Sequence, residues 1–201
     1  MMSDDNAELS TDGAVKNVVL VHGAFADGSG WRGVYDNLTS RGHRVTIVQI
    51  PLTSLEDDVA ATTRVLDQQD GPAVLVGHSW GGTVITQAGT HDKVAGLVYV
   101  AALVPDAGET AAQQYERFAP TPEFVIDVGD DGFGFLNREQ FKAVITTEDK
   151  AFDQAMLRHM AQRAGATITT VPGSHAVYAT QAEAVSEVIL SAAQNALVGA
   201  H

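Results

Sequence analysis

Residues 74–82 read VLVGHSWGG, an apolar run that leads into a serine with a glycine two positions to either side. This G-x-S-x-G pattern is typical of a nucleophile elbow, a sharp turn from a strand into a helix that holds the serine at its apex. Both glycines are needed because side chains at their positions would prevent so tight a turn from closing. The pattern therefore predicts a strand that ends near Val76 and makes Ser79 a candidate nucleophile.

Outward from this turn the chain alternates between short β-branched runs and segments with helical spacing. Strands are predicted over residues 17–22, 45–50, 73–76, 94–104, 143–147 and 167–171. Helices are predicted over residues 30–40, 54–66, 82–89, 152–164 and 181–198. Such alternation with short connections predicts an α/β fold with a doubly wound, mostly parallel sheet. Ligands bind at the carboxyl ends of the strands in such folds, and Ser79 falls there.

Residues 105–142 interrupt this alternation. Within them, residues 110–119 have helical spacing, and residues 123–136 read as a β-hairpin that turns at residues 129–132. Because the segment follows a strand end, it is predicted to overhang the site as a small, reduced cap. The rest of residues 17–201 is predicted to form a single domain, preceded by a polar, disordered leader over residues 1–16.

Composition narrows the classes of partner and of chemistry. With 201 residues and 45% hydrophobic residues, the chain is suited to one domain with a sizeable core. A net charge of -13 argues against nucleic acid or an anionic membrane as a partner. The chain has no cysteine, which excludes a disulfide framework, a thiol nucleophile and a thiolate metal site. Without a signal peptide or an apolar stretch of about 18 residues, it is expected to be soluble and cytoplasmic.

A serine nucleophile needs a base and an acid that orients the base. After a nucleophile elbow the expected order along the chain is serine, acid, histidine. His175 is the candidate base, because its loop follows a predicted strand and reaches the same sheet edge as Ser79. Asp149 is the preferred acid, and Asp106, which closes the strand after the nucleophile, is the alternative. Each also has an ordinary interpretation, as a backbone-bonded loop histidine, a helix N-cap and a turn residue respectively.

A tetrahedral oxyanion needs two preorganised hydrogen-bond donors. The candidates are the backbone amides of Ala24, in the loop after the first strand, and of Trp80, which follows the nucleophile. His22 is interpreted as a buried structural histidine without a chemical role. Nearby aromatic side chains either line a substrate pocket or pack in the core: Phe25, Trp31 and Tyr115.

Five stretches together carry a resemblance to a known family: VVLVHGAFADGSGW, VGHSWGG, LVYVAALVPDAGE, TTEDK and VPGSHAVYATQAEAV. They resemble the α/β-hydrolase superfamily, and more closely its bacterial small esterase-like members, which are related to plant methylesterases and hydroxynitrile lyases. The resemblance spans residues 17–193. It implies a nucleophile, acid and base at Ser79, Asp149 and His175, and oxyanion donors at Ala24 and Trp80.

Two features depart from the family pattern. Relatives usually place several helices between the cap hairpin and the acid, whereas here 43 positions (149 − 106) separate Asp106 from Asp149. The short cap predicts an active site that is either exposed or completed by another subunit of a homo-oligomer. The relatives that cleave cyanohydrins carry a lysine just after the histidine, where this chain has Ala176. That absence argues against the lyase reaction, because the lysine supplies positive charge for the leaving anion.

The resemblance implies a serine hydrolase that cleaves carboxylic esters of small or medium substrates through an acyl-enzyme on Ser79. It implies a small-molecule ester as partner and no metal or organic cofactor. Two other classes remain open: a ligand-binding protein without hydrolytic activity, and a cofactor-free lyase, cyclase or perhydrolase that uses the same site.

Overall fold

Four parallel strands form the central sheet of the computed structural model, which describes residues 14–116, 118, 121, 126–136, 149 and 151–196. In the order β2-β1-β3-β4, the strands are β2 (Arg44–Val48), β1 (Asn17–Val21), β3 (Ala73–His78) and β4 (Val94–Val100). The chain first adds β2 to one side of β1 and then returns to add β3 and β4 to the other side. The direction therefore reverses between β1 and β3. The predicted α/β fold with a doubly wound parallel sheet is confirmed.

The central strand β1 is buried on both faces, which explains its unbroken apolar sequence. Val18 and Leu20 belong to the hydrophobic cluster on one face of the sheet, and Val19 and Val21 belong to the cluster on the other face. This alternation follows from the two-residue period of a strand. A continuous β-branched run thus supplies both cores at once.

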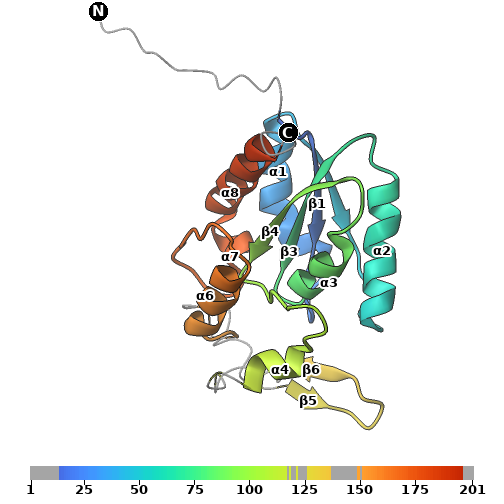
Figure 1. Cartoon of the computed structure of the whole chain (residues 1–201), viewed down its shortest axis with the longest axis vertical. Coiled ribbons are helices and arrows are strands. Elements are labelled where there is room, and N and C mark those ends of the chain that lie inside the picture. Colours follow the sequence, from blue (N-terminus) through green and yellow to red (C-terminus); the bar gives the residue numbers. More distant parts are fainter. Residues whose placement is uncertain are drawn as a thin grey trace, which may run out of the picture.

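Two pairs of helices cover the two faces of the sheet (Figure 1). One face carries α1 (Arg32–Ser40), which follows the short 3-10 turn η1 (Gly28–Trp31), together with α8 (Ala182–Asn195). The other face carries α2 (Leu55–Asp67) and α3 (Gly81–Ala88). Ser54 caps α2 by accepting a hydrogen bond from the Asp57 N–H at 3.0 Å, as its sequence predicts. None of the helices within the described ranges is both long and apolar enough to cross a membrane.

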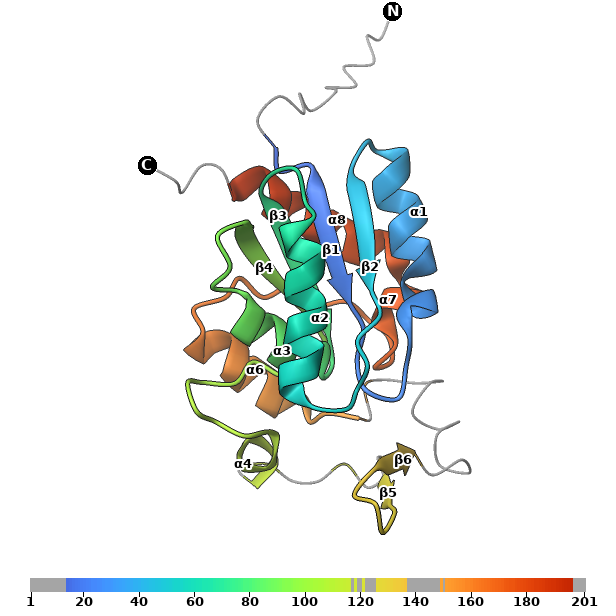
Figure 2. The same cartoon turned by 90° about the vertical axis from the view of Figure 1, so that its right-hand side faces the viewer.

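The remaining elements lie toward the carboxyl end of the sheet. Figure 2 shows α4 (Ala111–Glu116) and the β5–β6 hairpin beyond the end of β1 at which its arrowhead points. Strand β5 (Ile126–Val128) pairs antiparallel with β6 (Gly134–Leu136), so the predicted hairpin is present. Helices α6 (Gln154–Arg163) and α7 (Val177–Thr180) lead back to α8. The described parts of the segment predicted as a cap therefore lie at the same end of the sheet as Ser79.

The prediction of a strand over residues 167–171 is wrong. These residues form no strand, and residues 167–170 are exposed. A strand needs a neighbouring ladder for its backbone hydrogen bonds, and within the described residues β4 is the last strand on that side of the sheet. Strand β4 also ends four residues earlier than predicted, where Ala101 takes a φ of 43° and turns the chain. The predicted disordered leader over residues 1–16 is wrong at its end, because Val15 is buried in the core and its N–H donates to the Ala193 carbonyl oxygen at 3.0 Å. The leader up to residue 13, the strand over residues 143–147 and the end of the last helix lie outside the described residues.

Candidate active site

The turn between β3 and α3 holds Ser79 in a strained conformation. Strand β3 ends at His78 and α3 begins at Gly81, so only two residues make the turn. Ser79 has a φ of 53°, in the left-handed region that costs a non-glycine residue energy. A Cβ atom on Gly77 would lie 2.5 Å from the Gly81 carbonyl oxygen, and one on Gly81 would lie 2.8 Å from that of His22. No side chain fits at either glycine, which is the physical reason for the sequence pattern.

His175 and Asp149 meet in a mostly buried pair. The His175 Nδ1 atom lies 3.1 Å from the Asp149 Oδ2 atom, and the two side chains are 13% and 5% exposed. The other carboxylate oxygen, Oδ1, accepts hydrogen bonds from the backbone N–H groups of Ala151 and Phe152, both at 3.0 Å. Asp149 therefore caps a turn with one oxygen and contacts the imidazole with the other. The interpretation of Asp149 as a helix N-cap is wrong, because the N-cap of α6 (Gln154–Arg163) is Asp153, which accepts from the Met156 N–H.

His78 joins the elbow to the His175 loop. Its Nε2–H donates a hydrogen bond to the His175 carbonyl oxygen at 2.9 Å, and the two ring centroids lie 4.7 Å apart. Phe152 presses edge-on against the His175 ring, with centroids 4.8 Å apart. Among the described residues the Ser79 hydroxyl makes no hydrogen bond with the His175 ring, and such bonds are often long before substrate binds. The residue directly before Ser79 thus fixes where the His175 loop lies.

The pKa of His78 gives a prediction about stability. Burial, reinforced by the nearby His175, lowers this pKa well below 6.5. Below pH 6.5, His78 therefore binds a proton in the unfolded chain but stays neutral in the folded chain. The contribution of His78 to the free energy of unfolding should be constant above this pH. Below it, the free energy of unfolding should fall by up to about 1.4 kcal/mol per pH unit. Urea denaturation at about pH 7.5 and about pH 5.5 measures the loss.

His78→Gln is the control, because its amide retains a donor for the His175 carbonyl and does not titrate. The variant should lose less stability on acidification than the unmodified chain. Part of the loss of stability on acidification should remain in both the unmodified chain and His78→Gln, because burial also lowers the pKa of His43. Equal losses in the two proteins would contradict the assignment to His78.

The two candidate oxyanion amides lie at the reversal of the sheet. Val21 pairs with Gly77, so the loops that carry Ala24 and Trp80 leave from neighbouring strand ends. This reversal is where open α/β sheets bind ligands. Neither the Ala24 N–H nor the Trp80 N–H donates a hydrogen bond within the described part of the chain. Both donors are therefore available to a ligand.

A buried carboxylate that the sequence reasoning missed supports the elbow from α2. Asp58 Oδ2 accepts a hydrogen bond from the Trp80 indole N–H at 2.8 Å, and Oδ1 accepts one from the Leu52 N–H at 2.7 Å. Asp58 is buried, and its two charge-assisted bonds satisfy both oxygens. The available signal was an acidic residue four positions after the N-cap Ser54, on the side of the helix that also carries Ala61 and Thr62 to the core.

Of the three predicted pocket aromatics, Trp31 lies in the core. Its side chain is fully buried and has no exposed surface with which to line a pocket. Its ring centroid lies 4.6 Å from that of Tyr178 and 6.4 Å from that of His78. Trp31 therefore packs against His78 from within the core.

Phe25 and Tyr115 are the exposed members of that set, at 38% and 40%. Phe25 follows Ala24 directly and has a φ of 61°. Tyr115 lies on α4, with its ring 5.9 Å from that of Phe152. Partial burial and the carboxylate of Asp149 raise the pKa of Tyr115 to about 12, so the phenol stays protonated. Unlike Trp31, both side chains therefore retain exposed surface.

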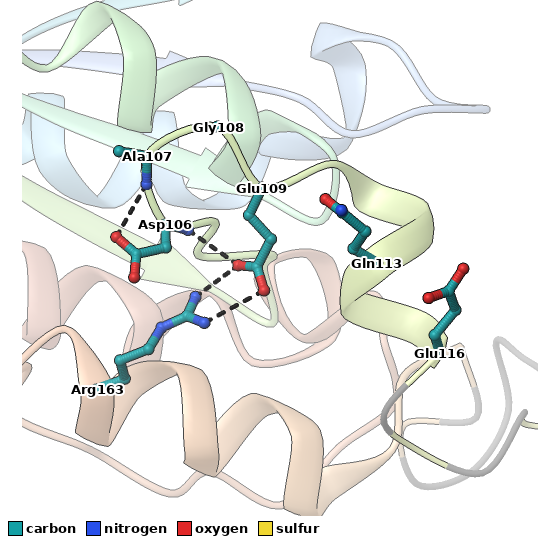
Figure 3. Close-up of a pocket in the computed structure, with 7 residues that line it drawn as sticks. All are labelled: Asp106, Ala107, Gly108, Glu109, Gln113, Glu116 and Arg163. Carbon is teal, nitrogen blue, oxygen red and sulfur yellow. Dashed lines mark hydrogen bonds and ion pairs between the residues drawn. The ribbon is translucent and has the colours of Figure 1, made fainter.

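Asp106, the alternative acid, faces a polar hollow of about 470 Å³ at the base of α4 (Figure 3). Its Oδ1 atom accepts a hydrogen bond from the Ala107 N–H at 2.9 Å, within its own turn. Its backbone N–H donates to Glu109, which is also paired with Arg163. The described contacts of Asp106 are thus with this turn, whereas the described carboxylate partner of His175 is Asp149. Among the described residues no group of three acidic or histidine side chains could hold a metal ion.

Comparison with known proteins places the chain in a family. The profile of the alpha/beta hydrolase family matches residues 18–143. The pyrethroid hydrolase of Sphingobium wenxiniae is 30% identical over 109 residues, which are 48% of this chain and 39% of that protein. Methylesterase 2 of Arabidopsis thaliana is 30% identical over 133 residues, 57% of this chain and 51% of that protein. The chain thus matches about half or less of the length of these curated relatives.

A solved structure gives the same fold over a longer range. A pyrethroid hydrolase superposes with a TM-score of 0.79 and covers 88% of this chain and 96% of that chain. The two sequences are 23% identical, a level at which the likeness concerns the fold alone. The resemblance seen in the sequence motifs is confirmed by the family profile and by this superposition.

Proposed function

Because the chain belongs to the alpha/beta hydrolase family, we propose that it is a serine hydrolase that cleaves carboxylic esters of small or medium substrates. One observation carries the proposal: His175 Nδ1 lies 3.1 Å from Asp149 Oδ2. The loop that carries His175 is hydrogen-bonded to His78, which directly precedes Ser79 in the strained turn. Nucleophile, base and acid on neighbouring loops are the constellation that acyl transfer needs.

Each group has a distinct role in the proposed reaction. His175 accepts the Ser79 proton while the serine oxygen attacks the ester carbonyl. The oxyanion that forms is stabilised by the N–H groups of Ala24 and Trp80. His175 then returns the proton to the leaving alcohol, which leaves an acyl-enzyme on Ser79. Water, deprotonated by His175, attacks this ester, and the acid product departs as Ser79 regains its proton.

Asp149 is the proposed acid. An ionised carboxylate next to His175 Nδ1 holds the proton on that nitrogen and leaves Nε2 free to act as the base. The two backbone N–H groups on its other oxygen stabilise the ionised form and fix its orientation. Asp106 has its described contacts with its own turn and Glu109, and it is the weaker candidate.

The domain and pocket assignments are part of the same proposal. Residues 17–201 form the hydrolase domain, and residues 105–142 form a reduced cap that leaves the site open. Phe25 and Tyr115 are proposed to contact the acyl or alcohol group of the substrate. Relatives named pyrethroid hydrolase and methylesterase support an ester substrate.

The test uses the purified protein with p-nitrophenyl esters of increasing acyl length. With an acyl group whose acyl-enzyme is hydrolysed more slowly than it forms, we expect a burst of p-nitrophenol stoichiometric with the protein. A fluorophosphonate should label the protein on Ser79, as located by peptide mass spectrometry. Absence of both burst and labelling across the series would refute the hydrolase and favour a ligand-binding protein.

A further inference from the structure

We propose that His22 is a positioning residue that fixes the peptide bond between Gly23 and Ala24, and so orients one of the two oxyanion donors. This inference rests on the proposed function, because it assigns a task within that same site. His22 is fully buried and lies just after β1, beside the elbow. Its hydrogen bonds determine which way the neighbouring peptide faces.

The tautomer of His22 follows from its partners. The backbone N–H of Ile50 donates to His22 Nε2 at 3.1 Å, so this nitrogen is an acceptor without a proton. The Gln49 amide nitrogen lies 3.0 Å from the same Nε2 atom, and the Gln49 Oε1 atom accepts a hydrogen bond from the Gly28 N–H. That second bond orients the Gln49 amide so that its NH₂ group faces the histidine. The neutral imidazole therefore carries its proton on Nδ1.

This proton fixes the next peptide plane. His22 Nδ1–H donates to the Gly23 carbonyl oxygen at 2.9 Å. The C=O of Gly23 and the N–H of Ala24 belong to one planar trans peptide and point in opposite directions. The Ala24 N–H therefore points away from His22. If this peptide flipped, the Ala24 N–H would face the His22 Nδ1–H, and two donors cannot form a hydrogen bond. The hydrogen bond from His22 Nδ1–H to the Gly23 carbonyl oxygen would also be lost.

The same peptide lies against the nucleophile. A Cβ atom on Gly23 would come within 2.7 Å of the Ser79 Cβ atom and 3.1 Å of His78 Nδ1, so the loop touches the elbow directly. The Ala24 N–H donates no hydrogen bond to any described residue. A free donor next to Ser79, held by a bond on the far side of its own peptide, is what preorganised oxyanion binding requires.

Two substitutions separate the two nitrogens of His22. In His22→Asn the amide nitrogen can occupy the place of Nδ1 and still donate to the Gly23 carbonyl. In His22→Gln the longer side chain brings its oxygen to the place of Nε2, where it accepts from Ile50, and the donor to Gly23 is lost. Loss of a whole oxyanion donor costs about 10²–10³ in kcat. We expect His22→Gln to lower kcat by about 10–100-fold with KM changed by less than about 3-fold, and His22→Asn to retain kcat within about 5-fold.

A spectroscopic readout distinguishes positioning from general damage. A trifluoromethyl ketone would form a hemiketal on Ser79, and its ionisation can be followed by fluorine NMR. Because the Ala24 N–H stabilises the ionised form, the hemiketal pKa should rise in His22→Gln and change little in His22→Asn. His43→Gln is the matched control, since His43 is also buried but precedes β2 at the other end of the sheet. It should lower the unfolding temperature without changing kcat or the hemiketal pKa.

The outcomes are distinct. An active unmodified protein whose His22→Gln variant keeps full kcat and an unchanged hemiketal pKa would overturn this inference alone. An unmodified protein that gives neither a burst nor an adduct would refute the proposed function and this inference with it. If His22→Gln does not fold, nitrogen NMR of the unmodified protein still decides: a proton on Nε2 of His22 overturns the inference, and a proton on Nδ1 supports it.

Discussion

Ser79→Ala is expected to abolish fluorophosphonate labelling and to lower kcat for p-nitrophenyl esters by about 10⁴-fold or more. The reason is that alanine removes the atom that forms the acyl bond, while hydrogen bonds to the ester carbonyl remain. Alanine can take the φ of 53° at a cost similar to that of serine, so the fold should be preserved. Steady-state kinetics, a labelling gel and the thermal unfolding midpoint measure the three effects.

Ser186→Ala is the matched control for removal of a buried serine hydroxyl. Ser186 lies in α8, and its hydroxyl donates to the Ala182 carbonyl oxygen at 2.7 Å. Its replacement should leave labelling and kcat as they are. Labelling that persists in Ser79→Ala and turnover that stays near the unmodified level would show that another residue is the nucleophile.

Asp149→Asn is expected to lower kcat by about 10⁴-fold while the local fold is retained. The asparagine oxygen can still accept hydrogen bonds from Ala151 and Phe152, as Asp149 Oδ1 does. Its NH₂ group then faces His175 Nδ1 and can donate only if that nitrogen has no proton. The imidazole would therefore carry its proton on Nε2, where it cannot act as a base toward Ser79.

Asp106→Asn is the comparison that decides between the two candidate acids. An asparagine oxygen can still accept from the Ala107 N–H, so the turn should survive and kcat should stay within about 3-fold. Activity is measured as kcat and KM on one ester, with unfolding temperatures to confirm folding. A large loss in Asp106→Asn with little loss in Asp149→Asn would transfer the acid role to the earlier strand end.

Local features of the sequence predicted the parts of the fold that depend on neighbours in the chain. The β1 and β3 runs are apolar throughout because both faces are buried, and the cap of α2 is visible in Ser54 and the acidic residues after it. The elbow was predictable because it too depends on residues close together in the chain. Its glycines are needed by contacts within five residues and with the adjoining strand end.

Features that depend on distant pairing were not predictable in this way. The β-branched run at residues 167–171 has the composition of a strand, yet it forms none, and residues 167–170 are exposed. Trp31 was a candidate for the pocket by its place in the chain. Packing against Tyr178 makes it a core residue instead.

The sequence by itself determined the order of the four strands of the central sheet and of the helices that cover it, the turn that carries Ser79, and the choice of His175 and Asp149 as candidates. Only the tertiary structure decided how these groups are supported. Asp58 reaches Trp80 across 22 positions, and His78 reaches the His175 carbonyl across 97. A one-dimensional pattern records residue types and spacing, whereas the direction of a hydrogen bond depends on how separate elements pack. For that reason the sequence supplied the candidate reacting groups, and the packing revealed the residues that contact them.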